Sequence, residues 1–264
     1  MCARLVAAGH EVKASDRATG SPAEAAATAD VLVTMLPGPG EVREAMGEAL
    51  PALRVGSTWI DTSTCSPSVG RELAQEAGRR GVRCLDAPVA GGPRAAETGS
   101  LHLFVGGDAA VLDEHRELLA ALAQRVLHVG GNGAGYTTKL LVNLLWFGQA
   151  VAVTEALLLG RRAGLEIDVL RAAIAGSAAA SEFLRSDLDA PLAGDYLPSF
   201  GIDRCLEELE AVGELARELS VPLEVGEAVE RVHRRAVERF GAVDGELLAV
   251  ALLEEEAGLR LRAV

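Results

Sequence analysis

The chain has 264 residues, of which 49% are hydrophobic and 24% are charged. It carries 25 Lys+Arg against 38 Asp+Glu, a formal net charge of −13, and this surplus of negative charge argues against nucleic acid or an anionic membrane surface as a partner. The length allows a substantial core in one large domain or two smaller ones, and the composition excludes a disordered or fibrous chain.

The N-terminal segment and the cysteines indicate a cytoplasmic protein. Residues 1–10 lack the long apolar core of a signal peptide. The four cysteines and five histidines are dispersed, without CxxC or metal-ligand spacing, which argues against a disulfide framework and a structural metal site. We therefore expect a soluble, cytoplasmic chain without a metal ion.

The basic residues are almost all arginine, because only two lysines occur, Lys13 and Lys139. Arginine stays protonated at any accessible pH, whereas the surroundings of a lysine can adjust it to give and take a proton. Lys139 lies in an apolar run and is therefore the better candidate for chemistry.

Residues 11 to about 129 alternate short β-branched runs with amphipathic segments. After a helix over 1–8, we expect strands at 11–15, 31–35, 58–61, 82–86, 101–105 and 126–129. Helices are expected at 22–28, 40–50, 66–80 and 109–123. Such alternation predicts an α/β domain over 1–131, with a Rossmann-type doubly wound parallel sheet and helices on both faces.

The pattern changes after residue 131. Residues 140–162 are apolar nearly all round, but Asn143, Gln149, Thr154 and Glu155 interrupt the run, so it predicts a buried helix and not a membrane span. Further helices are expected at 168–175, 181–188, 206–218, 226–239 and 245–257. The sequence thus predicts an all-α domain over 132–264. Its long apolar helix favours a homodimer or homotetramer.

The start of the chain lacks the opening strand and glycine-rich turn of a doubly wound domain. In such folds that turn brings backbone N–H groups to a pyrophosphate, and no G-x-G-x-x-G occurs near residue 1. The polypeptide either begins upstream or has lost its phosphate-binding turn. We favour the first explanation, because the rest of the domain is complete.

Asp16-Arg17 follows the first expected strand. An acid there hydrogen-bonds the adenosine ribose 2′-OH of NAD, whereas Arg accommodates the 2′-phosphate of NADP. The dipeptide leaves the choice open, and by itself it is also typical of a solvated strand end.

Five motifs in order carry a family resemblance. They are Ala8–Val12 with Asp16-Arg17, Thr34–Pro37, Asp61–Thr64 with Pro67, Asp86–Gly92 with Ala96, Gly99 and Leu101, and Gly133–Lys139 with Asn143. Together they resemble the β-hydroxyacid dehydrogenase family, which includes 3-hydroxyisobutyrate dehydrogenase and is related to 6-phosphogluconate dehydrogenase. The similarity runs from residue 1 to about 257.

This resemblance implies an NAD- or NADP-dependent dehydrogenase, with Lys139 as general acid/base and Asn143 positioning the lysine and the substrate hydroxyl. The spacing of four residues agrees, since it places both side chains on one helix face. The substrate would meet Ala90, Gly91 and Gly92, whose glycines allow backbone N–H groups to approach a carboxylate. The resemblance further implies a cofactor site made of Asp16, Arg17, Met35, Leu36, Pro37 and Thr64.

Two residues depart from the family pattern. Ala90 stands where the family usually has Ser, and the loss of that hydroxyl removes a hydrogen bond worth about 1.5 to 3 kcal/mol if nothing replaces it. Glu207-Glu208-Leu209 aligns with a Lys-Asp-Leu motif, so an acid replaces a lysine. Both changes disfavour an anionic substrate.

Three functions follow. The leading one is hydride transfer between nicotinamide and a small β-hydroxy acid or the related semialdehyde. An alternative is reduction of a neutral carbonyl or an imine, which Ala90 and Glu207 favour. A third is a non-catalytic dimeric relative with impaired cofactor binding, which the missing glycine turn favours and the retained Lys139 opposes.

Overall fold

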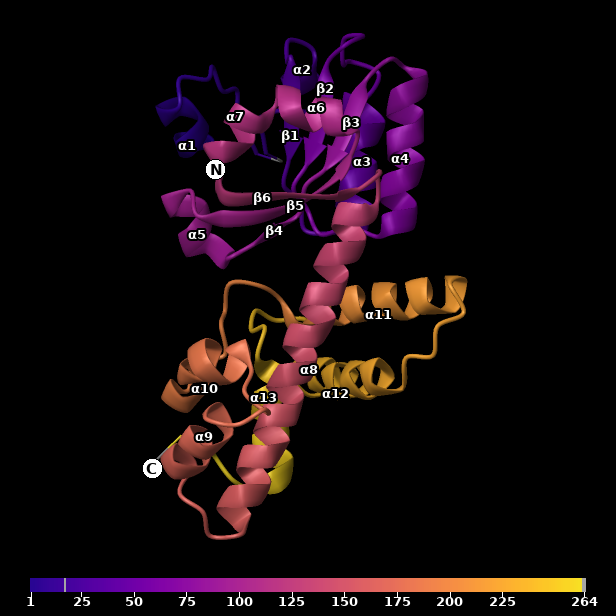
Figure 1. The fold of residues 1–264 in the computed structure, drawn as a ribbon. Helices are drawn as coiled ribbons and strands as arrows, with labels where there is room; N and C mark the ends of the chain where they lie inside the picture. The colour runs from indigo at the N-terminus through magenta and orange to yellow at the C-terminus, as the bar shows by residue number, and fades with distance from the viewer. Residues whose placement is uncertain (17, 263–264) are drawn as a thin grey trace. The chain divides into compact units, whose positions relative to one another are not determined.

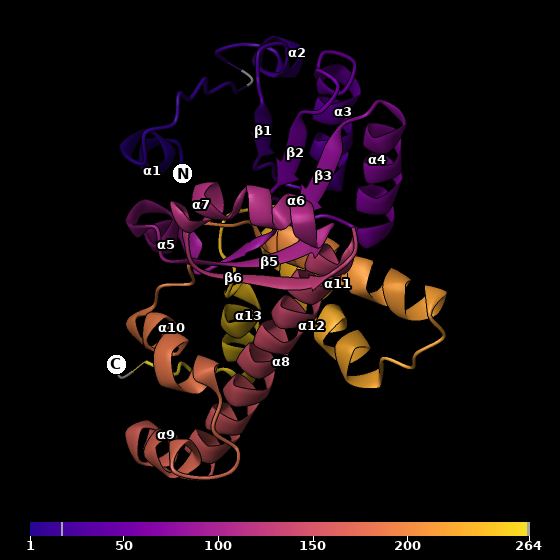
Figure 2. The ribbon, with the colours of Figure 1, turned by 45° about the horizontal axis from the view of Figure 1, so that its top comes forward.

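The computed structural model describes residues 1–16 and 18–262 (Figures 1 and 2). The chain forms two compact units, Met1–Leu140 and Leu141–Val264, and the boundary between them falls inside one long helix. Each unit has its own buried apolar clusters.

The first unit is an α/β domain around a six-stranded sheet. Its strands are β1 Val31–Thr34, β2 Thr58–Asp61, β3 Arg83–Asp86, β4 Val89–Ala90, β5 Leu101–Gly107 and β6 Ala123–Gly130. Its helices are α1 Cys2–Ala7, α2 Pro22–Ala26, α3 Pro39–Ala49, α4 Pro67–Arg79, α5 Gly92–Thr98, α6 Ala109–Glu114 and α7 Arg116–Ala120. Proline at the first turn of α2, α3 and α4 starts these helices without the loss of a backbone hydrogen bond.

Helices cover both faces of the sheet, as expected (Figure 1). Successive residues of a strand point to opposite faces, so Trp59 of β2 packs with α2, α3 and α4 whereas Ile60 packs with residues of α6 and α7. The strand order is β1-β2-β3-β5-β4, with β6 paired to β5.

The expected Rossmann-type α/β fold is confirmed, and its sheet is mixed, with antiparallel pairs beside the parallel ones. β1, β2 and β3 are parallel, but β5 runs antiparallel to β3. The chain leaves β3 at its carboxyl end and passes through β4 and the short α5. No crossover connection carries the chain back to the amino ends of the parallel strands. Strand β5 therefore runs in the direction opposite to β3.

The expected strand at 11–15 is wrong. These residues form no strand and are mostly exposed. A strand needs a neighbour for its backbone hydrogen bonds, and none of the described strands pairs with them. The expected helix at 109–123 is divided at His115, where α6 ends and α7 begins.

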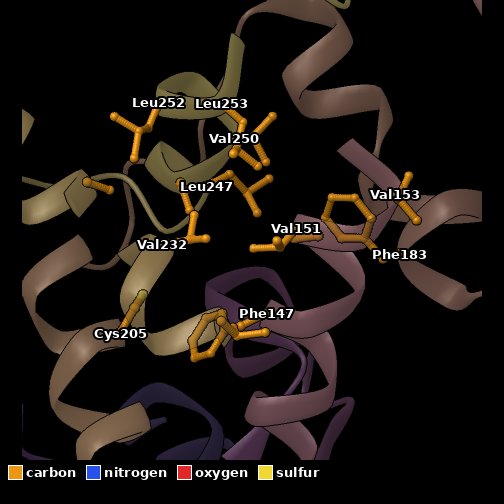
Figure 3. Close-up of a cluster of buried hydrophobic side chains, with 14 of the residues drawn as sticks. Phe147, Val151, Val153, Phe183, Cys205, Val232, Leu247, Val250, Leu252 and Leu253 are labelled. Carbon is orange, nitrogen blue, oxygen red and sulfur yellow. The ribbon is translucent and has the colours of Figure 1, made fainter. Parts of the chain in front are cut away.

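The second unit is helical, as predicted, apart from an isolated bridge between Gly201 and Asp244. Its elements are α8 Ala134–Arg162, which begins in the first unit, α9 Ile167–Ala175, the π-helix η1 Phe183–Asp187, α10 Asp189–Ala193, α11 Ile202–Glu218, α12 Glu224–Phe240 and α13 Leu248–Ala257. Its core joins Phe147 and Val151 of α8 to Phe183, Val232 and Leu253 from other helices (Figure 3).

The helix α8 is long and apolar enough to cross a membrane, with a mean hydropathy of 1.5 over 18 residues. This is weak evidence, because a core helix of a soluble protein has the same length and composition. On α8, Phe147, Ala150 and Leu157 are buried in the core of the second unit.

Candidate active site

Two buried aspartates lie side by side at the carboxyl edge of the sheet. Asp61 ends β2 and Asp86 ends β3, and the strand register pairs them. The carboxyl ends of parallel strands are where ligands bind in open α/β sheets. The carboxyl edge of this sheet is therefore the candidate ligand-binding site.

Neutral side chains surround the Asp61 carboxylate. It accepts hydrogen bonds from the hydroxyls of Thr34 (2.7 Å), Ser63 (2.6 Å) and Tyr136 (2.7 Å) and from the backbone N–H of Ser63 (3.2 Å). Thr34 lies at the end of β1 and Tyr136 in the first turn of α8. Asp61 thus joins the ends of two strands to the start of α8.

Asp86 holds the backbone at the same helix start. Its carboxylate accepts hydrogen bonds from the N–H groups of Gly133 (2.9 Å), Gly135 (2.8 Å) and Tyr136 (3.3 Å). These N–H groups precede the helical hydrogen-bond ladder, and the helix dipole favours an anion there. Asp86 therefore fixes the first turn of α8 to the end of β3.

Burial perturbs the acid–base properties of this cluster. Desolvation raises the pKa of Asp61 and of Asp86, against the hydrogen bonds that each accepts. Desolvation, together with the charge of Asp61, also raises the pKa of Tyr136 well above its ordinary value. The tyrosine hydroxyl therefore stays protonated and donates to Asp61.

The predicted cofactor loop follows β1. Met35 is 56% exposed, Pro37 is exposed and Leu36 is half-buried. The Leu36 N–H donates to the Ser63 hydroxyl (2.8 Å), which itself donates to Asp61. Thr64, the fourth predicted residue here, is half-buried in the next loop. The chain thus fixes the backbone of both loops and leaves side chains of the first exposed, which fits contact with a dinucleotide.

The predicted adenosine contacts are described only in part. The Asp16 carboxylate is exposed and accepts from the Thr19 hydroxyl (2.8 Å) and the Ala18 N–H (2.9 Å). The bond from Thr19 is the main cause that lowers the pKa of Asp16. Arg17 lies outside the described residues.

The predicted substrate loop is an exposed backbone turn. Ala90 ends β4 half-buried, and the exposed Gly91 and Gly92 follow with φ of +119° and +69°. Two successive positive φ values strongly favour glycine, which leaves the backbone uncovered by side chains. This conformation fits the approach of a small anion to backbone N–H groups.

Lys139 and Asn143 lie on α8, one turn apart, and both are half-buried. The Asn143 side-chain nitrogen donates to a carboxylate oxygen of Glu208 on α11 at 2.6 Å. Its neighbour Glu207 is exposed and forms an ion pair with Arg204. The position at which the family has a lysine thus carries the exposed Glu207, and the buried Glu208 follows it.

An open depression of about 400 Å³ lies beside the start of α8. Arg71, Asn132 and Thr137 are among its lining residues, and no predicted site residue lines it. We give it no function. Among residues 1–16 and 18–262, no group of three or more His, Cys, Asp or Glu side chains is arranged to hold a metal ion.

Reasoning from sequence did not include Asp61, Asp86, Tyr136 or Glu208 among the site residues. Asp61 and Asp86 carried a usable signal, because each is an acid that ends an expected strand. Tyr136 and Glu208 lie inside motifs that the sequence analysis quoted, but their partners carried no signal, since the bonds join residues 75 and 65 positions apart.

Two family models together match nearly the whole chain. Residues 1–130 match the NAD-binding domain of 6-phosphogluconate dehydrogenase. Residues 133–253 match the NAD-binding domain of NADP-dependent 3-hydroxyisobutyrate dehydrogenase.

Several dehydrogenases are similar in sequence or structure. The chain is 33% identical over 202 residues to 2-(hydroxymethyl)glutarate dehydrogenase of Eubacterium barkeri, covering 75% of this chain and 67% of that protein. It is 37% identical over 191 residues to a probable 3-hydroxyisobutyrate dehydrogenase of Mycobacterium tuberculosis, covering 67% and 65%. The match thus spans about two thirds of these relatives. The structure of Mycobacterium tuberculosis 3-hydroxyisobutyrate dehydrogenase with L-serine superimposes with a TM-score of 0.86 at 28% identity, over 97% of this chain and 94% of that one.

The α/β domain, its polar carboxyl edge and the helical second unit define a dinucleotide-dependent oxidoreductase. The family is equally clear: this chain belongs to the β-hydroxyacid dehydrogenases, as its motifs implied. The predicted enzyme class, an NAD(P)-dependent dehydrogenase, and the predicted cofactor, NAD or NADP, are confirmed by the two family models.

Proposed function

We propose that this protein transfers a hydride between nicotinamide and a small β-hydroxy acid or the corresponding semialdehyde, with Lys139 as the general acid/base. One observation carries the proposal: Asp86 and Asp61 fix the helix that bears Lys139 to the carboxyl edge of the sheet. Relatives named for 3-hydroxyisobutyrate and 2-(hydroxymethyl)glutarate, and a neighbour bound to L-serine, support a small hydroxy acid as substrate.

The chain's own residues account for the proton that accompanies the hydride. NAD or NADP, when bound, would supply the hydride acceptor for the oxidative direction. The neutral Lys139 amine takes the hydroxyl proton as the carbonyl forms, and its ammonium returns the proton on reduction. Asn143 orients the reacting groups, and the turn at Gly91-Gly92 offers N–H groups to the carboxylate.

The test replaces Lys139 by Ala. General acid–base catalysis contributes about 10²- to 10⁴-fold, so we expect kcat to fall by about that factor with NADH or NADPH affinity unchanged. Lys13→Ala is the control, since Lys13 is exposed and bonds the Glu24 carbonyl. Loss of cofactor binding in Lys139→Ala, or full turnover, would contradict the role. Absence of binding by the unaltered chain would favour the non-catalytic alternative.

A second candidate is reduction of a neutral carbonyl or an imine. Ala90 supplies no hydroxyl for a carboxylate, and the exposed Glu207 lies where the family has a lysine. A panel of hydroxy acids, neutral ketones and cyclic imines separates the two. Higher kcat/KM for the hydroxy acids rejects this alternative, and the reverse order rejects the first.

We further propose a soluble, cytoplasmic homodimer or homotetramer that binds neither nucleic acid nor membrane. The net charge of −13 supports the part of this proposal that excludes nucleic acid and anionic membrane surfaces. We propose residues 1–131 as the dinucleotide-binding domain and 132–264 as the substrate and dimerisation domain, as the change of sequence pattern after residue 131 suggests; the compact units of the fold divide nine residues later, after Leu140.

A further inference from the structure

The second unit holds a buried acid against the proposed positioning residue. Glu208 of α11 is 8% exposed, although glutamate is rarely buried unless it is paired. Its carboxylate accepts from the Asn143 side-chain nitrogen at 2.6 Å, a short distance for an N–H donor. Removing this charge from water is costly, and the bond to Asn143 offsets part of the cost.

This contact fixes the orientation of the Asn143 amide. An ionised carboxylate only accepts hydrogen bonds, and a side-chain amide donates through its nitrogen and accepts through its oxygen. The nitrogen must therefore face Glu208, and Oδ1 lies on the other side of the amide. Without the acid, the two ends of the amide have nearly the same shape, so rotation about χ2 would exchange them.

We propose that Glu208 is a positioning residue that sets which end of the Asn143 amide is available to the reaction. This inference rests on the proposed function. With the nitrogen bound to Glu208, Oδ1 is left to accept from an N–H or O–H group. The amine of Lys139, one helical turn earlier, and a substrate hydroxyl are both such donors. A reversed amide would direct N–H groups at these donors and repel them.

The hydrogen bond can be measured without any enzyme assay. The sequence contains two asparagines, Asn132 and Asn143, so selective ¹⁵N-asparagine labelling yields two side-chain NH₂ groups. Asn132 donates to the Cys84 carbonyl (3.0 Å) and serves as an internal control. In the full chain we expect Glu208→Gln to move the Asn143 NH₂ protons upfield and to leave those of Asn132 unchanged. An unmoved Asn143 signal overturns the inference, whatever the activity of the protein.

A double-mutant cycle tests the effect on catalysis. A hydrogen bond to a charged group contributes about 1.5 to 3 kcal/mol, so Glu208→Gln should lower kcat about tenfold or more while the KM for the cofactor stays unchanged. If Glu208 acts through Asn143, the same change in an Asn143→Ala background lowers kcat no further. Equal losses in both backgrounds would mean that Glu208 acts elsewhere.

Two further variants separate positioning from folding. Glu214→Gln removes an exposed acid from the same helix and should leave kcat unchanged. Glu208→Asp keeps the charge with one methylene less, so it should preserve the amide orientation and restore most of the kcat that Glu208→Gln loses. If Glu208→Asp is as impaired as Glu208→Gln while its Tm matches that of the unaltered chain, the inference fails. Should the chain show no dehydrogenase activity, the proposed function fails and the NMR result alone decides this inference.

Discussion

Each unit contains a tyrosine hydroxyl bonded to a buried carboxylate, and the two carboxylates have different surroundings. In the first, the Tyr136 hydroxyl donates to Asp61, which is 0% exposed, at 2.7 Å. In the second, the Tyr196 hydroxyl donates to Glu254, which is 1% exposed, at 2.6 Å. The other partners of Asp61 are uncharged, whereas Glu254 also accepts from the Arg260 guanidinium at 3.1 Å.

The partners show what each pair does. Those of Asp61 are Thr34, Ser63 and Tyr136, at the ends of β1 and β2 and the start of α8, so the pair organises the proposed site. Glu254 also accepts from the N–H of Leu261 at 2.6 Å and fixes the segment that follows α13. A buried acid beneath a tyrosine is therefore not by itself a sign of function, and its other partners decide its role.

The largest expected effect in this comparison comes from removal of the acid. Asp61→Ala leaves four donors without an acceptor inside the first unit, and we expect the free energy of unfolding to fall by about 4 kcal/mol. Glu254→Ala should cost less, about 2 kcal/mol, because the Arg260 side chain is 42% exposed and can bond water instead. Urea unfolding at pH 7 measures both, and an equal or reversed order would refute the distinction.

The second unit should lose stability in acid through a histidine. His233 is 1% exposed, its ring packs on Phe147 (centroids 5.1 Å apart), and desolvation lowers its pKa to about 4. Between pH 6.5 and 4 the unfolded chain binds a proton that the folded chain refuses, so stability present above pH 6.5 is lost as the pH falls. The difference in pKa corresponds to roughly 3 kcal/mol.

This prediction is checked by the change in unfolding free energy between pH 7 and pH 4. His233→Asn can still donate to the Val229 carbonyl but does not titrate there, so its loss between the two pH values should be smaller by roughly 3 kcal/mol. His10 is exposed, and His10→Asn should keep the loss of the unaltered chain. Parallel pH curves for His233→Asn and the unaltered chain would show that His233 is not responsible.

The smallest effect comes from the tyrosine hydroxyls. Tyr136→Phe deprives the fully buried Asp61 of a donor and should cost about 1.5 kcal/mol. Tyr196 is half-buried and Glu254 keeps its bond to Arg260, so Tyr196→Phe should cost about 0.5 kcal/mol. The chain has two tyrosines, so each variant leaves one. Their difference in Tm sharpens the comparison, and a larger shift for Tyr196→Phe would contradict it.

Local patterns predicted most elements of this fold. The alternating runs located β2 at 58–61 to the residue, and the helices expected at 40–50 and 66–80 start within one residue of α3 and α4. The direction of β5 was not predictable, because it depends on the path of the chain through β4 and α5 and not on the residues of the strand itself. The segment 11–15 was predicted wrongly for a related reason. Its residue pattern is typical of a strand, but a strand forms only where a neighbouring strand pairs with it.

The candidate site, like the fold, could be predicted from the sequence only in part. The motifs single out Lys139 and Asn143 as site residues, which stays a prediction, and helical spacing places them on one face of α8. The groups that hold them could not be found by spacing, because Asp86 and Gly135 are 49 residues apart and Asn143 and Glu208 are 65 apart. Long-range polar contacts between motifs are the part that required a structure.

Close backbone packing at Gly135 limits how near α8 can approach the sheet. A Cβ atom at this position would lie 2.4 Å from the Phe104 carbonyl oxygen and 2.6 Å from that of Asp86, both backbone atoms. The separation of helix and sheet is therefore set by main chain against main chain, which no change of rotamer can adjust. Lys139 lies four residues further along α8. Its distance from the strands is therefore set by this contact between backbone atoms.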